Sequence, residues 1–257
     1  MAIQTGSKIQ KLLSSWPSGA ILTSTRLKHQ GYSHVLLNHY RKTGWLVSVG
    51  RGAFARTGDA VDWRGGLYAL QEQLKLPVHL GGKSALAYHG SAHFLQLGSE
   101  AVTLFGAPGT RLPGWFTTYN WKAKVDFVAT NLLPDDLGIT SQDVGAFSIK
   151  ISSRERAMLE SLHLVPEKQS LAETKKLMLG LTNLRPQLVQ SLLENCTSVK
   201  VKRLFMLFAE QLKLPWAKRL NLGAVDLGTG ARTIVKGGKY HPKYLLTIPE
   251  DLFGEEI

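Results

Sequence analysis

The chain has 257 residues, 44% of them hydrophobic and 19% charged, which suits two modest folded domains and excludes a disordered chain. No apolar run approaches the roughly 20 residues that cross a bilayer, the start MAIQTGSKIQ lacks a secretory signal, and the single Cys196 excludes an internal disulfide, so a protein of the reducing cytoplasm is expected. The net charge is +12, and residues 1–60 carry eight basic side chains against one acidic, or +7, which indicates a polyanionic partner, most simply nucleic acid.

The first sixty residues begin with two predicted helices. SKIQKLLSSWP has its apolar residues at the spacing of one helix face, and Pro17 ends this helix. A short extended piece follows. A second helix is then expected to begin with Ser24 or Thr25 as its N-cap and to end at Gly31.

A third helix and a hairpin follow. Ser33 is expected to cap the helix and Gly44 to end it, with Val35, Leu36 and Tyr40 facing inward. WLVSV and AFAR alternate apolar and polar residues around Gly-Arg-Gly, which predicts a two-stranded hairpin with an arginine at its tip. Three helices followed by a hairpin are typical of a winged helix-turn-helix.

The polar outer face of this module is the predicted DNA-binding site. Asn38 and Arg41 are expected to read bases, because asparagine can pair with adenine and arginine with guanine. The other side chains are expected to contact phosphate or the minor groove or to complete the face. The full predicted set is Thr25, Arg26, Ser33, His34, Asn38, His39, Arg41, Lys42 and Arg51. The alternative is a winged helix that docks on a protein.

Two helices and a false motif follow the hairpin. DWRGGLYALQEQLK predicts a helix over residues 62–75. Gly-Lys-Ser at residues 82–84 suggests a phosphate loop, but Pro77 stands where that motif requires glycine. We therefore expect a helix that begins near Lys83, buries Leu86 and ends at Gly90.

The rest of the chain predicts a mixed α+β region. AVTLFG, GWFTTYN, KVDFVAT and AFSIKIS are expected to form a small antiparallel sheet, and ARTIVKGG and KYLLTIP two later strands. Ser152 with Glu155, and Ser170 with Glu173, fit capping boxes at helix starts. RPQLVQSLLENC and KVKRLFMLFAEQLKL carry apolar stripes of the kind that form a helical core.

The sequence does not favour catalysis or a metal. The nuclease-like set Asp126, Asp135, Asp136 and Lys150 lacks the acid-x-lysine step, because Ser148 stands where the acid belongs. His89 and His93 have helical spacing, but the glycine between them is expected to end the helix. No cofactor is expected, and Cys196 is expected to be a buried structural thiol. A second basic surface is predicted from Lys200, Lys202, Arg203, Lys236 and Lys239.

Four motifs in order carry a resemblance to a known family. LGGKSALAYHGSAHFL after the winged helix, ISSRERAMLESLHLVP, SVKVKRLFMLFAEQLKLPW and DLGTGARTIVKGGKYHPKYLLTIP resemble the AbiEi antitoxins of type IV abortive-infection toxin–antitoxin systems. This resemblance implies a repressor that binds inverted repeats in its own promoter and counteracts a nucleotidyltransferase toxin.

The resemblance divides the chain into a DNA-binding region, residues 1–95 with the winged helix at about 1–60, and an antitoxin domain, residues 96–257. The prediction is thus an α+β protein that is not an enzyme and has operator DNA and a toxin as partners. The alternatives are an enzyme that acts on nucleic acid through its C-terminal domain and a protein-docking adaptor.

Overall fold

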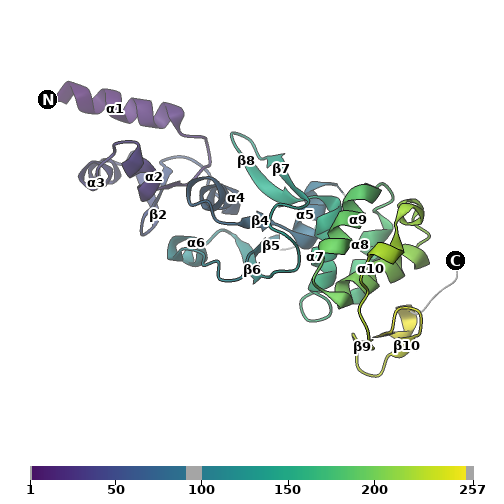
Figure 1. The fold of residues 1–257 in the computed structure, drawn as a ribbon. Coiled ribbons are helices and arrows are strands. Elements are labelled where there is room, and N and C mark those ends of the chain that lie inside the picture. The colour runs from purple at the N-terminus through teal and green to yellow at the C-terminus, as the bar shows by residue number, and fades with distance from the viewer. Residues whose placement is uncertain (1, 91–99, 253–257) are drawn as a thin grey trace. The chain divides into compact units, whose positions relative to one another are not determined.

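The computed structural model describes residues 2–90 and 100–252 (Figure 1). The chain forms two compact units, each built from segments that are distant in sequence. Unit 1 comprises Met1–His79, Gly98–Ala129 and Ser141–Lys150, and unit 2 comprises Leu80–Leu97, Thr130–Thr140 and Ile151–Ile257. The predicted boundary between residues 95 and 96 lies outside the described residues. Both units contain helices and strands, so the predicted α+β class is confirmed.

Unit 1 begins with the predicted winged helix-turn-helix. Its elements in chain order are α1 (Ala2–Ser15), β1 (Leu22–Thr23), α2 (Ser24–His29), α3 (His34–Lys42), β2 (Leu46–Gly50) and β3 (Ala53–Arg56). The strands form an antiparallel sheet of order β1-β3-β2, in which β2 and β3 are the wing hairpin. Leu12 from α1, Leu27 from α2 and Leu37 from α3 are buried in a common core.

The inner face of α3 differs from the predicted one. Tyr40 is buried as expected, but Leu37 takes the other core position, Leu36 is half-buried, and Val35 is 81% exposed. The helix opens with three consecutive apolar residues, so their spacing alone does not select which of them faces inward. The prediction for Val35 was wrong.

Hydroxyl side chains cap the N-termini of α2 and α3. The hydroxyl of Ser33 accepts a hydrogen bond from the Leu36 amide at 3.3 Å, as predicted for α3. The cap of α2 is Thr23 rather than Ser24 or Thr25, because its hydroxyl accepts from the Arg26 amide at 3.2 Å. Such caps satisfy backbone amides that lack an intrahelical partner.

The largest sheet has strand order β6-β5-β4-β8-β7. Its strands are β4 (Val78–Leu80), β5 (Glu100–Gly106), β6 (Ala123–Ala129), β7 (Ile139–Asp143) and β8 (Ser148–Ser152). The pairs β5–β6 and β4–β8 are parallel, so the predicted antiparallel sheet was wrong. Its predicted strands at 101–106, 124–130 and 146–152 correspond to β5, β6 and β8.

The fourth predicted strand, GWFTTYN, is instead the helix α6 (Gly114–Thr118). Parallel neighbours need a crossover connection, and α6 lies in the connection between β5 and β6. Trp115 and Phe116 are buried, so the aromatic residues that suggested a strand serve the core from a helix. The helix predicted over 62–75 is confirmed as α4 (Trp63–Tyr68) with its π-helical continuation η1 (Ala69–Gln73).

Unit 2 is mainly helical. Its longer elements are α5 (Gly82–Tyr88), α7 (Arg154–His163), α8 (Leu171–Leu179), α9 (Pro186–Asn195) and α10 (Val199–Gln211). The short elements that follow are η2 (Pro215–Arg219), η3 (Leu222–Ala224), β9 (Arg232–Thr233), β10 (Lys239–His241), β11 (Leu246–Ile248) and η4 (Glu250–Leu252). The helices α7 to α10 gather around one core in Figure 1, and Phe205 and Phe208 of α10 are fully buried in it.

The start of α7 lies one residue later than predicted. Ser153, not Ser152, caps the helix and accepts from the Arg156 amide at 3.4 Å. Ser152 is buried, and its hydroxyl donates to the Glu160 carboxylate at 2.7 Å. The predicted cap of α8 is confirmed, since the Ser170 hydroxyl accepts from the amide of the residue three positions later at 3.0 Å.

Candidate nucleic-acid interface

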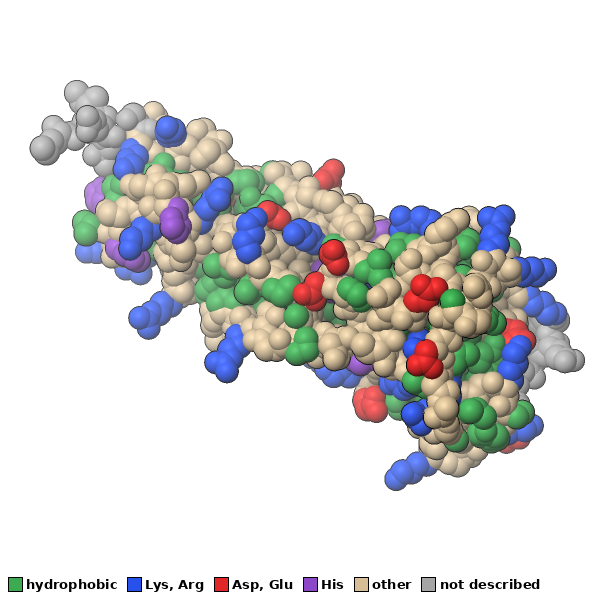
Figure 2. All heavy atoms as spheres, viewed as in Figure 1, with side chains coloured by type: hydrophobic (Ala, Val, Ile, Leu, Met, Phe, Trp, Pro, Cys, Tyr) green, Lys and Arg blue, Asp and Glu red, His purple; other side chains and the backbone are tan. Residues whose placement is uncertain are grey.

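All nine side chains of the predicted DNA-binding set are exposed. Thr25 and Arg26 belong to α2, Ser33 precedes α3, Arg51 is in the wing turn, and the other five, His34, Asn38, His39, Arg41 and Lys42, belong to α3. Figure 2 shows basic and histidine side chains gathered over the end of the molecule where Figure 1 places α2 and α3. The first acidic residue of the chain is Asp59, so α2, α3 and the wing carry no negative side chain.

The helix α3 presents two parallel lines of side chains to solvent. At 3.6 residues per turn, His34, Asn38 and Arg41 follow one line, and Val35 and His39 begin the neighbouring one. Burial of Leu37 and Tyr40 fixes the opposite face on the core. An α-helix with its side chains is about 10–12 Å across, which fits a major groove roughly 12 Å wide.

The wing tip is built to project an arginine. Gly50 and Gly52 on either side of Arg51 have φ of +155° and +86°, backbone conformations that residues with a Cβ rarely adopt. A Cβ on Gly50 would also lie 2.8 Å from the Cβ of Trp115. The strand β2 therefore needs glycine at this turn, and Arg51 extends from it into solvent.

Two of the eight basic residues in 1–60 have structural roles. Lys8 donates to the Gly31 carbonyl at 2.8 Å, and Arg56 pairs with Asp59 at 2.9 Å. The remaining six are exposed: Lys11, Arg26, Lys28, Arg41, Lys42 and Arg51. The predicted set omitted Lys11 and Lys28. Both are among the eight basic residues counted in 1–60, so the charge count was the signal that could have found them.

The predicted second basic surface does not form as one patch. Lys202 and Arg203 are 5% and 2% exposed, whereas Lys236 and Lys239 are exposed. The Arg203 guanidinium donates to four backbone carbonyls at 2.7–3.3 Å, those of Leu227, Gly228, Gly230 and Leu245. Arg203 thus holds the segment around β9 and β11 on α10.

Lys200 also has a structural partner. Its ammonium donates to the carbonyls of His163 and Val165, where α7 ends, and burial lowers the pKa of Lys200. A cation near the first turn of α10 is unfavourable for the dipole of that helix. Its ammonium reaches the negative end of α7 instead, where a cation is stabilising.

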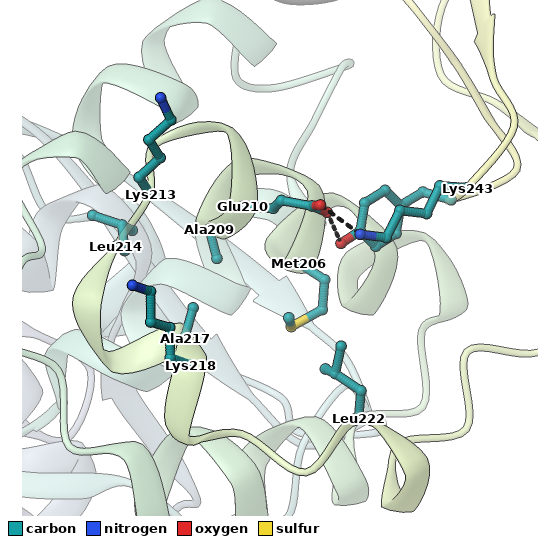
Figure 3. A pocket seen from close by; sticks show the side chains of 10 residues that line it. Met206, Ala209, Glu210, Lys213, Leu214, Ala217, Lys218, Leu222 and Lys243 are labelled. Carbon is teal, nitrogen blue, oxygen red and sulfur yellow. Dashed lines mark hydrogen bonds and ion pairs between the residues drawn. The ribbon is translucent and has the colours of Figure 1, made fainter. Parts of the chain in front are cut away.

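A cavity of about 500 Å³ opens beside α10 in unit 2 (Figure 3). Met206, Ala209 and Leu214 supply apolar lining, and Glu210 lies at its side. The Glu210 carboxylate accepts from Lys243 and from the Tyr244 hydroxyl, and these bonds lower the pKa of Glu210. This paired carboxylate stays ionised and is not suited to act as a general acid.

A smaller cavity of about 280 Å³ contains a buried carboxylate, that of Glu155. Arg185 donates to it through Nε, Nη2 and its backbone amide, each at 3.0 Å. Burial by itself raises the pKa of Glu155, but the hydrogen bonds from Arg185, from its own backbone amide and from the Ser153 side chain together outweigh burial and lower the pKa to about 2.

Arg185→Met is expected to destabilise the protein in a pH-dependent way. Because the folded pKa of Glu155 lies below its usual value of 4.5, its contribution is complete above pH 4.5 and is lost as pH falls from there toward 2. The Arg185 side chain is largely exposed, so we expect only about 1–2 kcal/mol at neutral pH. Urea unfolding of both proteins should show this difference in the free energy of unfolding shrinking between about pH 5 and pH 2.

Arg154→Met is the matched control for this titration. Arg154 lines the same cavity, but it donates to the backbone carbonyl of His89. A backbone carbonyl does not titrate. The difference in the free energy of unfolding between wild type and Arg154→Met should not change over the same pH range. If it shrinks equally, the role assigned to Glu155 is contradicted.

Among the described residues, no group of three His, Cys, Asp or Glu side chains lies so as to hold a metal ion. His89 contacts the Ser152 carbonyl at 2.9 Å through Nε2, and His93 lies outside the described residues. Cys196 is buried as predicted, and burial raises the pKa of its thiol. No helix in the described part of the chain is both long and apolar enough to cross a membrane.

The chain matches the models of a known protein family. Residues 5–97 match the model of the AbiEi antitoxin N-terminal domain, and residues 99–249 match that of the type IV toxin–antitoxin transcriptional regulator AbiEi. The fold is similar to the crystal structure of the RV2827C protein from Mycobacterium tuberculosis, with a TM-score of 0.61 and 17% identity over 95% of this chain and 90% of that chain. No curated protein matches in sequence.

Proposed function

The chain belongs to the AbiEi family of antitoxins, the transcriptional regulators of type IV toxin–antitoxin systems, and we propose that it represses its own operon by binding inverted repeats in the promoter. The observation that carries this proposal is the exposed face of α2, α3 and the wing turn, which bears five cationic side chains, Arg26, Lys28, Arg41, Lys42 and Arg51, and no acidic one. Such a face attracts the phosphate backbone and presents a helix to the major groove.

The side chains divide into two roles. Asn38 and Arg41 lie on one line of α3 and read base edges. Thr25, Arg26, Ser33, His34, His39, Lys42 and Arg51 position the module on phosphate or in the minor groove. An inverted repeat presents two equivalent half-sites, so two copies of the chain bind one operator.

The antitoxin activity is assigned to the C-terminal region. The family match over residues 99–249 supports a region that counteracts a nucleotidyltransferase toxin encoded beside this gene. Repression and neutralisation can be separated by expressing residues 1–257 from an unrelated promoter together with that toxin. Rescue of growth under these conditions supports neutralisation, whereas loss of rescue would limit the protein to repression.

Footprinting on the DNA upstream of the gene tests the proposed repressor. A protected inverted repeat is expected, with log affinity falling linearly with log salt at about 0.9 per phosphate contact. A face with five exposed cations in each copy predicts a steep slope, on the order of −4 to −5 for each bound copy. Weak protection without a defined site would contradict sequence-specific repression.

A further inference from the structure

Val35 is an apolar side chain on the exposed face of α3. It is 81% exposed, the largest exposed fraction among the large hydrophobic residues of the described chain. His34, Asn38 and His39 around it are all exposed and polar. A lone exposed apolar residue is ordinary on a protein surface. Val35 differs from such residues in its position, because it is the second residue of α3.

Folding does not account for valine at this position. A β-branched residue lowers helix stability slightly relative to alanine, and at 81% exposure it gains little burial in return. In helix-turn-helix proteins the N-terminal residues of the recognition helix contact base edges in the major groove. Val35 stands at that end of α3, two residues after its cap Ser33.

The major-groove edge of only one base carries a methyl group, the C5-methyl of thymine. We propose that Val35 reads a thymine methyl in each half-site of the operator, which makes it a specificity-determining residue. This inference rests on the proposed function, because it needs α3 in the major groove.

The neighbours of Val35 define the context of that thymine. Residues three apart on a helix are adjacent, so Asn38 lies one turn beyond Val35 along the same exposed face. Asparagine pairs with adenine through N6 and N7. The pair therefore selects a half-site in which the thymine read by Val35 neighbours the adenine read by Asn38.

The test is a thymine-by-deoxyuridine scan of the footprinted operator, which deletes single methyl groups without altering base pairing. Full-length wild type, Val35→Ala and Leu179→Ala are compared by fluorescence anisotropy on each duplex. Leu179 is the control, because it is also an exposed aliphatic residue, 57% exposed, but lies on α8 in unit 2. Alanine is the better helix former, so Val35→Ala keeps α3 intact, which thermal unfolding checks.

In wild type, deoxyuridine at one thymine per half-site is expected to weaken binding about fourfold, the value of one buried methyl group. Val35→Ala should bring that ratio close to one, and Leu179→Ala should leave it fourfold. A protected operator with no methyl dependence, or with a ratio that Val35→Ala leaves unchanged, overturns this inference alone. Absence of a protected operator overturns the proposed function and this inference together.

Discussion

Replacing Arg41 and Lys42 together by glutamate is expected to weaken operator binding by at least two orders of magnitude. Both side chains are exposed in the last turn of α3, and each cation that contacts phosphate releases counterions on binding. The double variant removes the base contact of Arg41 and the phosphate contact of Lys42, and it places two repulsive charges on the same face. The slope of log affinity against log salt should fall by about 0.9 for each bound copy, the share of one phosphate contact.

The matched control for this variant is Lys236→Glu with Lys239→Glu. It makes the same change in net charge at two exposed positions of unit 2. If binding depends on contacts of α3, the control should retain the affinity of wild type within a few-fold at moderate salt, because it leaves every side chain of α2, α3 and the wing unchanged. Equal loss in both double variants would contradict the interface and indicate binding by net charge.

Charge reversal in the last turn of α3 also acts on the helix itself. Cations there complement the helix dipole, and their replacement by anions costs about 0.5 kcal/mol each. Arg41→Gln with Lys42→Gln removes the contacts without adding repulsion. Its binding should lie between the wild-type and glutamate proteins, and its helix content by circular dichroism should equal that of wild type.

The winged helix could be predicted from sequence because its signals are local. Pro17 ends α1, Ser33 caps α3, and the two glycines beside Arg51 define the wing turn, each within a few residues of the element it shapes. Exposure of the predicted DNA-binding residues follows from the same local pattern. The exposure of Val35 could not be predicted in this way. Its pattern indicated an inward side chain, but the face that α3 turns to the core is decided by packing against other elements.

Features that depend on distant partners could not be predicted in the same way. The sheet is parallel where β5 meets β6, since α6 provides a crossover that GWFTTYN did not reveal. Lys200 and Arg203 look like surface cations in sequence. Both side chains instead donate hydrogen bonds to backbone carbonyls, Lys200 at the end of α7 and Arg203 around β9 and β11, because buried carbonyls need a donor. The apolar residues on every side of α10 were the available sign that polar neighbours on this helix would also be buried.

A buried ion pair in unit 2 is expected to carry the largest stability effect. Arg156 and Glu160 are 5% and 1% exposed, and the Arg156 Nε donates to the Glu160 carboxylate at 2.8 Å. Arg156→Met is expected to lower the free energy of unfolding by about 3–5 kcal/mol, because it leaves Glu160 buried without its counter-charge. Urea unfolding followed by far-ultraviolet circular dichroism measures this loss.

Adding a second substitution to Arg156→Met separates the charge effect from lost packing, because the two causes predict opposite changes in the free energy of unfolding. Glu160 also accepts from the Gly82 amide at 2.9 Å and the Ser152 hydroxyl at 2.7 Å, bonds that the carbonyl oxygen of a glutamine can retain. If the cost of Arg156→Met comes from an uncompensated charge, adding Glu160→Gln should recover about 1–2 kcal/mol.

Lost packing or lost donors predict the opposite sign. The Arg156 guanidinium also donates to the Pro134 and Leu137 carbonyls, and Glu160→Gln does nothing to satisfy these two acceptors. If their loss dominates, the double variant will be no more stable than Arg156→Met. Recovery would instead mean that Arg156 is retained chiefly because Glu160 is buried, and that the pair holds the start of α5 and the end of β8 on α7.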